Sequence, residues 1–360
     1  MIKILHLQTE INLACGVTRT ISQIIKNSST NFEHHLIAIG GDGVKRFNNF
    51  GFSPQIINLN KDSFYGTIKI LYRIFKYCKK NSIQIIHCHH RYFDSIIWIL
   101  KSLLKIKTIT SVQSKVSGKK TFSYKAEILI ACSKAIKNHL INNFQINENR
   151  IRVIYNAVEL KSILNTKEKN QIAKEIGIKV DKHIIGFVGR IDFAEKGVDI
   201  LLEAFNQLSN SNPSVHLLLV GDGPNNQEVK KYYDLKKENT TLLSAKENIF
   251  DYYNLMDVIV LPSRVDPFPL AMLETGLMSK PFIGSNVDGI PEIIIDGHNG
   301  LLFESENVEE LKNQILKVIN DKELSEKLAK NLNRTVLESY TTDKILPKYK
   351  EVYLDVLRQL

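Results

Sequence analysis

Short runs of β-branched and other apolar residues alternate with amphipathic stretches along the chain, and this alternation limits the fold more than any other feature. Apolar runs of about four to eight residues between turn residues are typical of buried strands, whereas a periodicity of about 3.6 residues is typical of helices. Strands that alternate with helices form parallel sheets, because each parallel connection is long enough to hold a helix. The sequence therefore predicts an α/β protein.

The length of 360 residues exceeds what one ordinary core holds and suits two domains of about 150 to 180 residues. We expect a first doubly wound domain at 1–160, a second at 161–341, and a C-terminal helix at about 342–360 that packs back on the first. The predicted strands are 2–7, 35–39, 56–59, 83–88, 107–112, 128–131, 151–154, 183–188, 215–220, 258–261 and 281–284. The predicted helices are 67–80, 133–142, 198–208, 270–278, 308–318, 322–339 and 342–360, with Ser133 as an N-cap. The polar stretch 160–181 is the expected linker, and a short helix is one form that it can take. Two such domains are expected to face each other across a cleft, where strand ends and helix beginnings meet.

Composition restricts the location of the protein. No apolar run reaches the roughly 20 residues that a membrane-spanning helix needs, and the opening MIKILHLQTE has the pattern of a strand rather than of a signal peptide. The four cysteines lack metal-type and redox spacing, which favours reduced, packed thiols. We expect a cytoplasmic protein, with peripheral attachment to the inner face of the cytoplasmic membrane as the alternative.

Charge is divided unevenly along the chain. The net charge is +10, but residues 1–160 hold 23 basic and 8 acidic residues, a net +15, and residues 161–360 hold 25 and 30, a net −5. Such a field attracts an anionic membrane surface, an acidic glycan or nucleic acid. The basic residues concerned are Lys69, Arg73, Lys76, Lys80, Lys115, Lys119, Lys120 and Lys125. Ordinary solvated lysines are an equal alternative, and nucleic acid ranks last because no nucleic-acid-binding motif is present.

The loop after the predicted strand 183–188 has the composition of an anion site. Gly189 permits a tight exit from the strand, and Arg190 and Lys196 follow it before the next helix. Two cations beside the free N–H groups of a helix start match a diphosphate. The alternative is that the glycine serves the turn and both cations are solvated.

Two further strand ends carry polar or turn-forming residues. Gly221 and Gly223 make a sharp turn after the strand 215–220, which brings backbone close to any bound ligand. Asp266 and Glu274 flank Phe268 and Pro269, and a proline suits the first turn of a helix. Both carboxylates can therefore accept hydrogen bonds from sugar and ribose hydroxyls, although paired surface charges are the alternative.

Together these stretches resemble glycosyltransferase family 4, whose members are retaining enzymes of the GT-B architecture. The resemblance is most specific over 185–303 and extends more weakly over 2–158. It implies that Arg190 and Lys196 hold the donor diphosphate, that Asp266 contacts the donor sugar, and that Glu274 contacts the ribose. It further implies donor contacts at Gly16, Gly189, Gly221, Gly223, Lys246, Asn248, Ile249, Phe268, Pro269 and Leu270.

The chain departs from the family pattern at four positions. Asp266 is one methylene shorter than the usual glutamate, and Gly16 stands alone where two glycines are usual. Ala157 replaces a common glycine, and Gln113 replaces a histidine near the reacting centre. Glutamine forms hydrogen bonds but cannot carry a proton charge. These departures bear on donor identity and on catalytic competence.

The stretch IIHCHHRYFD places His87, His89 and His90 together at a strand end. His87 and His89 are two residues apart and share a face of the strand. A metal site is one interpretation, but no carboxylate ligand lies within local spacing. Contact of His89 with acceptor or donor is a second, and ordinary hydrogen-bonded histidines are the third.

The resulting hypothesis is a metal-independent transferase that needs no cofactor. It moves a hexose or N-acetylhexosamine from a nucleotide-sugar, with UDP favoured, to a glycan or lipid-linked acceptor in the assembly of surface polysaccharide or lipooligosaccharide. Gln113 and His89 are the expected acceptor or sugar contacts. Two alternatives stay open: a sugar-nucleotide epimerase of the same fold, and a binding subunit that has lost catalysis.

Overall fold

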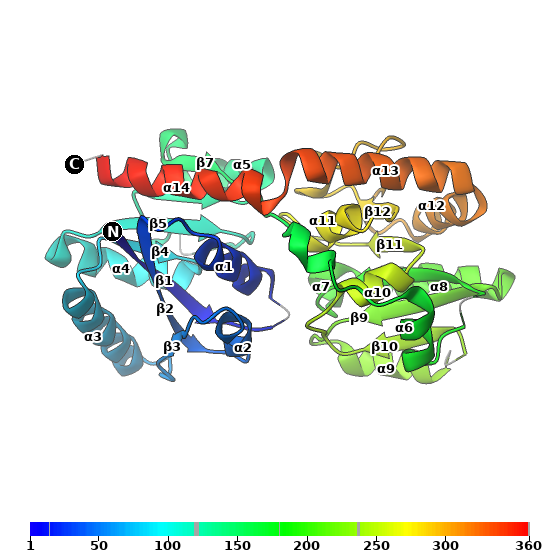
Figure 1. Ribbon diagram of the computed structural model, residues 1–360, viewed down its shortest axis with the longest axis horizontal. Helices are drawn as coiled ribbons and strands as arrows, with labels where there is room; N and C mark the ends of the chain where they lie inside the picture. Colours follow the sequence, from blue (N-terminus) through cyan, green and yellow to red (C-terminus); the bar gives the residue numbers. More distant parts are fainter. Residues whose placement is uncertain (14, 119–121, 180, 236–237, 359–360) are drawn as a thin grey trace. The chain divides into compact units, whose positions relative to one another are not determined.

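The computed structural model describes residues 1–13, 15–118, 122–179, 181–235 and 238–358 (Figure 1). By its internal contacts the chain divides into two compact units. The N-terminal unit comprises Met1–Asn156 together with Thr342–Leu360, and the C-terminal unit comprises Ala157–Thr341. The last two residues of the predicted C-terminal helix, 359 and 360, lie outside the described residues.

A seven-stranded parallel sheet forms the centre of the N-terminal unit, in the order β3-β2-β1-β4-β5-β6-β7. Its strands are β1 Ile2–Glu10, β2 Phe32–Gly40, β3 Gln55–Ile56, β4 Ile85–Cys88, β5 Lys107–Val112, β6 Ile128–Ala131 and β7 Ile151–Val153. Its α-helices are α1 Gly16–Lys26, α2 Val44–Asn48, α3 Phe64–Asn81, α4 Arg91–Leu104, α5 Lys134–Phe144 and α14 Thr342–Arg358. The strand order reverses beside β1, which is the doubly wound pattern that binds ligands at strand ends.

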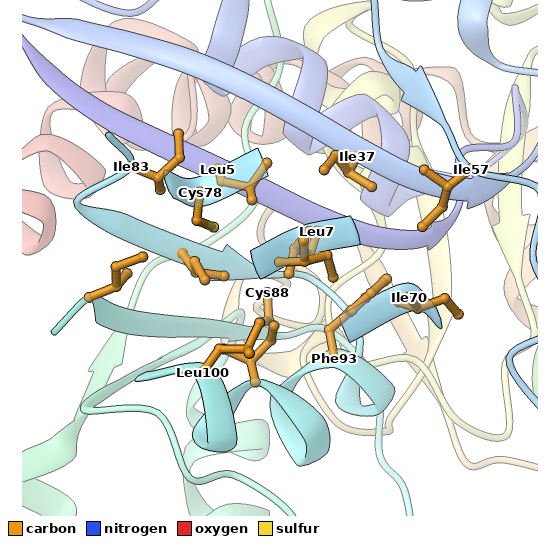
Figure 2. Close-up of a cluster of buried hydrophobic side chains, with 14 residues drawn as sticks. Leu5, Leu7, Ile37, Ile57, Ile70, Cys78, Ile83, Cys88, Phe93 and Leu100 are labelled. Atoms are coloured by element: carbon orange, nitrogen blue, oxygen red, sulfur yellow. The ribbon is translucent and has the colours of Figure 1, made fainter. Parts of the chain in front are cut away.

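The two faces of this sheet are covered by different helices. On one face, Ile70, Cys78, Phe93 and Leu100 from α3 and α4 pack on Leu5 and Leu7 of β1, as Figure 2 shows. The neighbouring residue His6 points to the opposite face, because successive side chains alternate along a strand. There the Tyr353 hydroxyl of α14 contacts His87 of β4, so the C-terminal helix covers this second face.

The C-terminal unit contains a six-stranded parallel sheet in the order β10-β9-β8-β11-β12-β13. Its strands are β8 His183–Val188, β9 Val215–Val220, β10 Thr240–Leu243, β11 Val258–Leu261, β12 Phe282–Ser285 and β13 Leu301–Phe303. Its α-helices are α6 Lys169–Ile176, α7 Phe193–Lys196, α8 Val198–Ser211, α9 Asn226–Leu235, α10 Phe250–Leu255, α11 Leu270–Leu277, α12 Val308–Asn320 and α13 Lys322–Ser339. This sheet is also doubly wound, with its reversal beside β8, so the predicted α/β class is confirmed.

Several predicted elements have the bounds that the structure shows. β5, β6, β8, β9, β11 and α13 match, and Ser133 caps α5 by accepting a hydrogen bond from the backbone N–H of Ile136. The expected strand 56–59 was wrong in extent, because β3 spans only Gln55–Ile56. The stretch 160–181, predicted as a linker with a short helix as one possibility, contains the short helix α6, which packs on α10. Among the described residues, no helix is long and apolar enough to cross a bilayer.

Candidate functional site

The β8–α7 and β9–α9 loops of the C-terminal unit are interlocked. Ile191 donates its backbone N–H to the carbonyl of Asp222 at 3.1 Å. A Cβ on Gly221 would lie 1.8 Å from the carbonyl oxygen of Gly189, and one on Gly223 would lie 2.1 Å from that of Ile191. Only glycine allows the two loops to approach this closely, because any larger residue would overlap backbone atoms. The two glycine positions therefore fix the backbone at the ends of two neighbouring strands.

Lys196 and Asp266 form an ion pair beside these loops. The Lys196 Nζ lies 2.7 Å from Asp266 Oδ2, and the side chains are 21% and 5% exposed. Asp266 Oδ2 also accepts a hydrogen bond from the Ser263 hydroxyl at 3.2 Å, and the Asp266 backbone N–H donates to Asp288. Asp266 is thereby held at the end of β11 in a single geometry. A buried carboxylate with one cation and one hydroxyl can bind the hydroxyl groups of a sugar.

Arg190 lies in the β8–α7 loop, whereas Lys196 is the last residue of α7, and the two side chains have different partners. Its guanidinium pairs with Asp192 at 3.2 Å and with Glu195, and its side chain is 48% exposed. Asp192 caps α7 by accepting from the Glu195 backbone N–H at 2.9 Å, which holds both acids near the guanidinium. The described contacts therefore bring Lys196 and Asp266 together. Arg190 is not part of this ion pair and instead binds Asp192 and Glu195 in a more exposed position.

Glu274 lies in the second turn of α11 and is buried. Its carboxylate accepts a hydrogen bond from the Tyr253 hydroxyl of α10 at 2.9 Å. Pro269 is the N-cap of α11, so the helix begins at Leu270, as the sequence predicts. The first backbone N–H groups of this helix have no partners within the helix and can receive an anion.

The segment 246–249 joins β10 to α10 and is tied to the glycine turn. The backbone N–H of Ala245 donates to Asp222 Oδ2 at 2.7 Å. Ile249 is buried at the start of α10, whereas Asn248 is exposed. The Lys246 ammonium lies 6.0 Å from the centre of the Tyr252 ring. The ends of β9 and β10 are therefore linked through one carboxylate.

The predicted residues of the N-terminal unit lie at strand ends and at a helix start. Gly16 is the first residue of α1, and Gln113 follows β5 directly and is partly exposed. His89 follows β4 and is buried, and its Nδ1 has no hydrogen-bond partner among the described residues. That nitrogen can therefore donate to a ligand or accept from one.

His89 ends a chain of buried histidines. His6 contacts His89 through its Nδ1 at 2.9 Å and His34 through its Nε2 at 2.8 Å. His34 continues the chain to the Ser28 hydroxyl at 2.7 Å. Burial lowers the pKa of His34 to about 4 and that of His89 to about 3, and it also lowers the pKa of His6 well below its usual value. The chain therefore consists of neutral imidazoles at physiological pH.

Three of these rings have the spacing of metal ligands. One ring nitrogen each of His6, His87 and His89 lie within 4.8 Å of one another. His87, however, uses both ring nitrogens, on the Tyr353 and Ser111 hydroxyls, and His6 uses both on histidines. His90, the third histidine of the sequence cluster, instead caps α4 through its Nδ1. His6, His34 and His89 therefore form one hydrogen-bonded chain, and His87 is bound separately by two hydroxyls.

Two family profiles match the chain in succession. The profile described as Glycosyltransferase Family 4 matches residues 15–162, and the profile described as Glycosyl transferases group 1 matches residues 168–335. The chain belongs to glycosyltransferase family 4.

Relatives of this glycosyltransferase cover almost its whole length. The capsular polysaccharide biosynthesis glycosyltransferase CapM of Staphylococcus aureus is 23% identical, over 99% of this chain and 98% of its own. The UDP-Gal:alpha-D-GlcNAc-diphosphoundecaprenol alpha-1,3-galactosyltransferase of Escherichia coli is 25% identical, over 88% and 85%. The structure of Anabaena HepE in complex with UDP-glucose matches with a TM-score of 0.87 at 18% identity, over 99% of this chain and 100% of HepE. These likenesses show a GT-B-like fold.

Three features of this glycosyltransferase escaped the sequence analysis. Ser263 and Tyr253 each bind one carboxylate of the acid pair, and His6 joins the histidines of β4. Ser263 could have been found, because it follows β11 by two residues and precedes Asp266 by three. His6 could not, because its pairing with His87 depends on which strands are neighbours in the sheet.

Proposed function

We propose that this glycosyltransferase transfers a hexose or an N-acetylhexosamine from a UDP-sugar to a glycan or lipid-linked acceptor, with retention of anomeric configuration. The observation that carries the proposal is the contact between Lys196 and Asp266 beside the interlocked glycine turns. A fixed cation, a buried carboxylate and close backbone are the groups that recognise a sugar diphosphate. UDP is favoured because the relatives' names include UDP-galactose and UDP-glucose.

Each residue receives one role in this proposal. Lys196 binds the diphosphate, and Arg190, whose side chain is 48% exposed, does so by exchanging its acidic partners for phosphate oxygens. Asp266 accepts hydrogen bonds from the sugar hydroxyls, and Glu274, positioned by Tyr253, accepts them from the ribose. The backbone at Phe268, Pro269 and Leu270 binds the sugar-phosphate, and Lys246, Asn248 and Ile249 surround the base.

The chemistry consists of charge stabilisation. When the bond between the anomeric carbon and the β-phosphate oxygen breaks, negative charge grows on the diphosphate and positive charge on the sugar. Lys196, Arg190 and the N-terminus of α11 stabilise the diphosphate, a task that a divalent cation performs in other enzymes. The acceptor oxygen attacks from the side of the leaving group, and its proton passes to the departing diphosphate. Retention follows because the new bond forms on the face that the old bond leaves.

The N-terminal unit is assigned to the acceptor in this proposal. Gly16, the first residue of α1, is assigned a contact with the donor phosphates, and the open nitrogen of His89 and the amide of Gln113 are assigned contacts with the acceptor or the transferred sugar. Capsule synthesis by one relative and a diphosphoundecaprenol acceptor in the name of another support an acceptor in surface polysaccharide assembly. We also propose a cytoplasmic location with contact to an anionic membrane surface.

A thermal-shift panel tests the donor first. UDP and UDP-sugars are expected to raise the unfolding temperature of the purified protein, and GDP and GDP-mannose are not. Radiolabelled donor is then incubated with and without an undecaprenyl-diphosphate-linked sugar. Transfer of label to the lipid-linked sugar is expected. Stabilisation by GDP-sugars alone would contradict the donor, and conversion of the donor without acceptor would indicate an epimerase.

A further inference from the structure

Exposed large hydrophobic side chains gather on two neighbouring helices of the N-terminal unit. Thirteen such residues occur among the described residues, and seven of them lie on α3 and α4. They are Phe64, Tyr65, Ile68 and Tyr72 on α3, and Trp98, Ile99 and Leu103 on α4. Phe64 and Tyr65 are 77% and 75% exposed. Single exposed hydrophobic residues are ordinary, but a group of this kind marks an interaction surface.

The helices present these residues because their other faces are occupied by the core. Ile70 and Cys78 of α3 and Phe93 and Leu100 of α4 point into the cluster of Figure 2. The two helices lie side by side over the same face of the sheet (Figure 1). Since the core takes one side of each helix, the exposed hydrophobic residues lie on the side away from the sheet. We name this side of the two helices the α3–α4 face.

The α3–α4 face is also cationic. The exposed residues of α3 include Lys69, Arg73, Lys76, Lys79 and Lys80, and its sequence contains no acidic residue. The one acid of α4, Asp94, is buried and accepts hydrogen bonds from Thr110 and from the backbone of Lys125 and Ala126. Neither helix therefore has an exposed carboxylate that would offset the positive charge of these side chains.

Aromatic rings and ammonium groups are mixed on the outer surface of α3. The Lys76 ammonium lies 4.7 Å from the centre of the Tyr72 ring, and the Lys79 ammonium lies 4.9 Å from that of Phe75. Tyrosine and tryptophan settle at the boundary between headgroups and acyl chains, and lysine and arginine bind anionic headgroups. The two kinds of side chain on this face therefore match the two layers of a bilayer surface.

We propose that the α3–α4 face docks the protein on an anionic lipid bilayer, with its aromatic side chains among the headgroups and its cations on the phosphates. This docking surface deepens the proposed function, on whose membrane contact it rests. A lipid surface is favoured over a protein partner because interfaces between proteins are depleted in lysine, whereas this face carries four of them on α3 alone. Lys119 and Lys120, which the sequence analysis adds to the basic group, lie outside the described residues.

The single tryptophan of the chain reports on this surface. Trp98 is 48% exposed and lies on α4 within the proposed contact. Vesicles that contain phosphatidylglycerol are expected to shift its emission to shorter wavelength, and brominated acyl chains are expected to quench it. Vesicles of phosphatidylcholine alone are expected to do neither. Binding is measured in parallel by co-sedimentation, so that a Trp98→Phe variant loses the emission signal and still sediments.

Two double variants and one matched control separate the contribution of the cations to vesicle binding from that of the aromatic side chains. Lys69→Gln with Lys76→Gln is expected to weaken vesicle binding about 25-fold, roughly fivefold for each cation. Phe64→Ser with Tyr65→Ser is expected to weaken it about tenfold or more, because apolar contact with the acyl boundary is lost. Lys327→Gln with Lys330→Gln removes the same charge from exposed positions of α13 and is expected to leave binding unchanged.

Several outcomes would overturn the docking surface. If the protein sedimented with phosphatidylglycerol vesicles while the emission of Trp98 did not shift, the contact with the bilayer would lie elsewhere on the protein. A Trp98 shift that follows protein concentration without vesicles would show that a second copy of the chain covers the face. Absence of vesicle binding in a protein that still binds UDP-sugar would refute docking alone, whereas vesicle binding without any donor binding would refute the transferase alone.

Discussion

Lys196 and Asp266 are separated by 70 positions in the sequence, yet the Lys196 Nζ lies 2.7 Å from Asp266 Oδ2. The ion pair joins the loop after β8 to the loop after β11, two strands that are neighbours in the sheet. Asp266 is nearly fully buried, so its carboxylate depends on this cation and on the Ser263 hydroxyl for compensation. A residue longer by one methylene would have to move one of these partners, which is a physical reason for aspartate at this position.

Lys196→Ala is expected to lower kcat/KM at least about 100-fold, because a cation that stabilises the leaving diphosphate is lost. It is also expected to lower the free energy of unfolding by about 1 to 3 kcal/mol, since a buried carboxylate loses its partner. Transfer kinetics and urea unfolding measure the two effects. Lys312→Ala removes a lysine that is 21% exposed, as Lys196 is, but that pairs with the exposed Glu309 on α12, so it is expected to change neither. Full activity of Lys196→Ala would refute its assigned role.

Tyr253→Phe is expected to raise the KM for donor about tenfold and to leave kcat nearly unchanged. Its hydroxyl positions Glu274, whose assigned contact with the ribose is equal in the ground state and the transition state. Tyr232→Phe is the matched control, because its hydroxyl donates to the Leu202 carbonyl in the same unit. Steady-state kinetics should show no change in KM for this control. An equal rise in KM for both variants would indicate a general loss of stability instead.

Gly223→Ala is expected to weaken UDP-sugar binding and to destabilise the protein by more than about 2 kcal/mol. The added Cβ would lie 2.1 Å from the Ile191 carbonyl oxygen, so the two loops must separate. Gly40→Ala is the control, because its Cβ would meet no atom within 4 Å. Thermal shift with and without donor measures both effects. If Gly223→Ala still bound UDP-sugar normally, the turn at Gly223 would not be part of the donor site.

Stability is expected to fall as the pH decreases from about 6.5 towards 4. Burial holds the pKa of His34 at about 4 and of His89 at about 3, and it lowers those of His6 and His87 as well. Below the unfolded pKa of about 6.5 the unfolded chain binds protons that the folded chain excludes, so each histidine removes up to about 1.4 kcal/mol per pH unit. Above pH 7 the contribution is complete and constant.

Urea unfolding at several pH values measures this dependence. In a His34→Gln variant the free energy of unfolding is expected to fall less steeply with decreasing pH, because one of the buried histidines no longer contributes to the slope. Stability that does not change between pH 7 and 5 would mean that the buried rings take up protons over the same pH range in the folded and the unfolded chain, and it would contradict their lowered pKa.

Activity is expected to survive treatment with EDTA, because Lys196, Arg190 and the start of α11 are assigned the work of a divalent cation. Transfer assays on EDTA-treated protein, with and without added Mg²⁺, measure this. Loss of activity that Mg²⁺ alone restores would contradict the proposed chemistry.

The sequence predicted the buried strands well because their signal is local. β8 and β9 are unbroken apolar runs between turn residues, and their bounds match the prediction. β10 and β13 lie at the sheet edges and give a weaker signal, because β10 begins with two threonines and β13 has only three residues. α4 was not predicted, because the apolar runs of this region were considered only as possible membrane spans.

The sequence predicted which residues belong to the candidate site but not which residues they contact. Loop composition identified Lys196, Asp266 and Glu274, because glycine, proline and charge at strand ends carry local information. The partners Tyr253 and Ser263, and the link from Asp222 to the backbone of Ala245, depend on how separate loops pack. The roles of these residues stay predictions until the variants above are measured.

Helix α14 contains the last described residues of the chain, yet it completes the unit that contains the first. Its Tyr353 hydroxyl binds His87, and Tyr349 is buried against the same sheet. During synthesis this face stays uncovered while the ribosome translates residues 157–341, which takes roughly 10 to 40 s. The unit that residues 1–156 begin is therefore finished only after the other unit has been made, and a stop codon ahead of residue 342 would damage the sheet that is translated first.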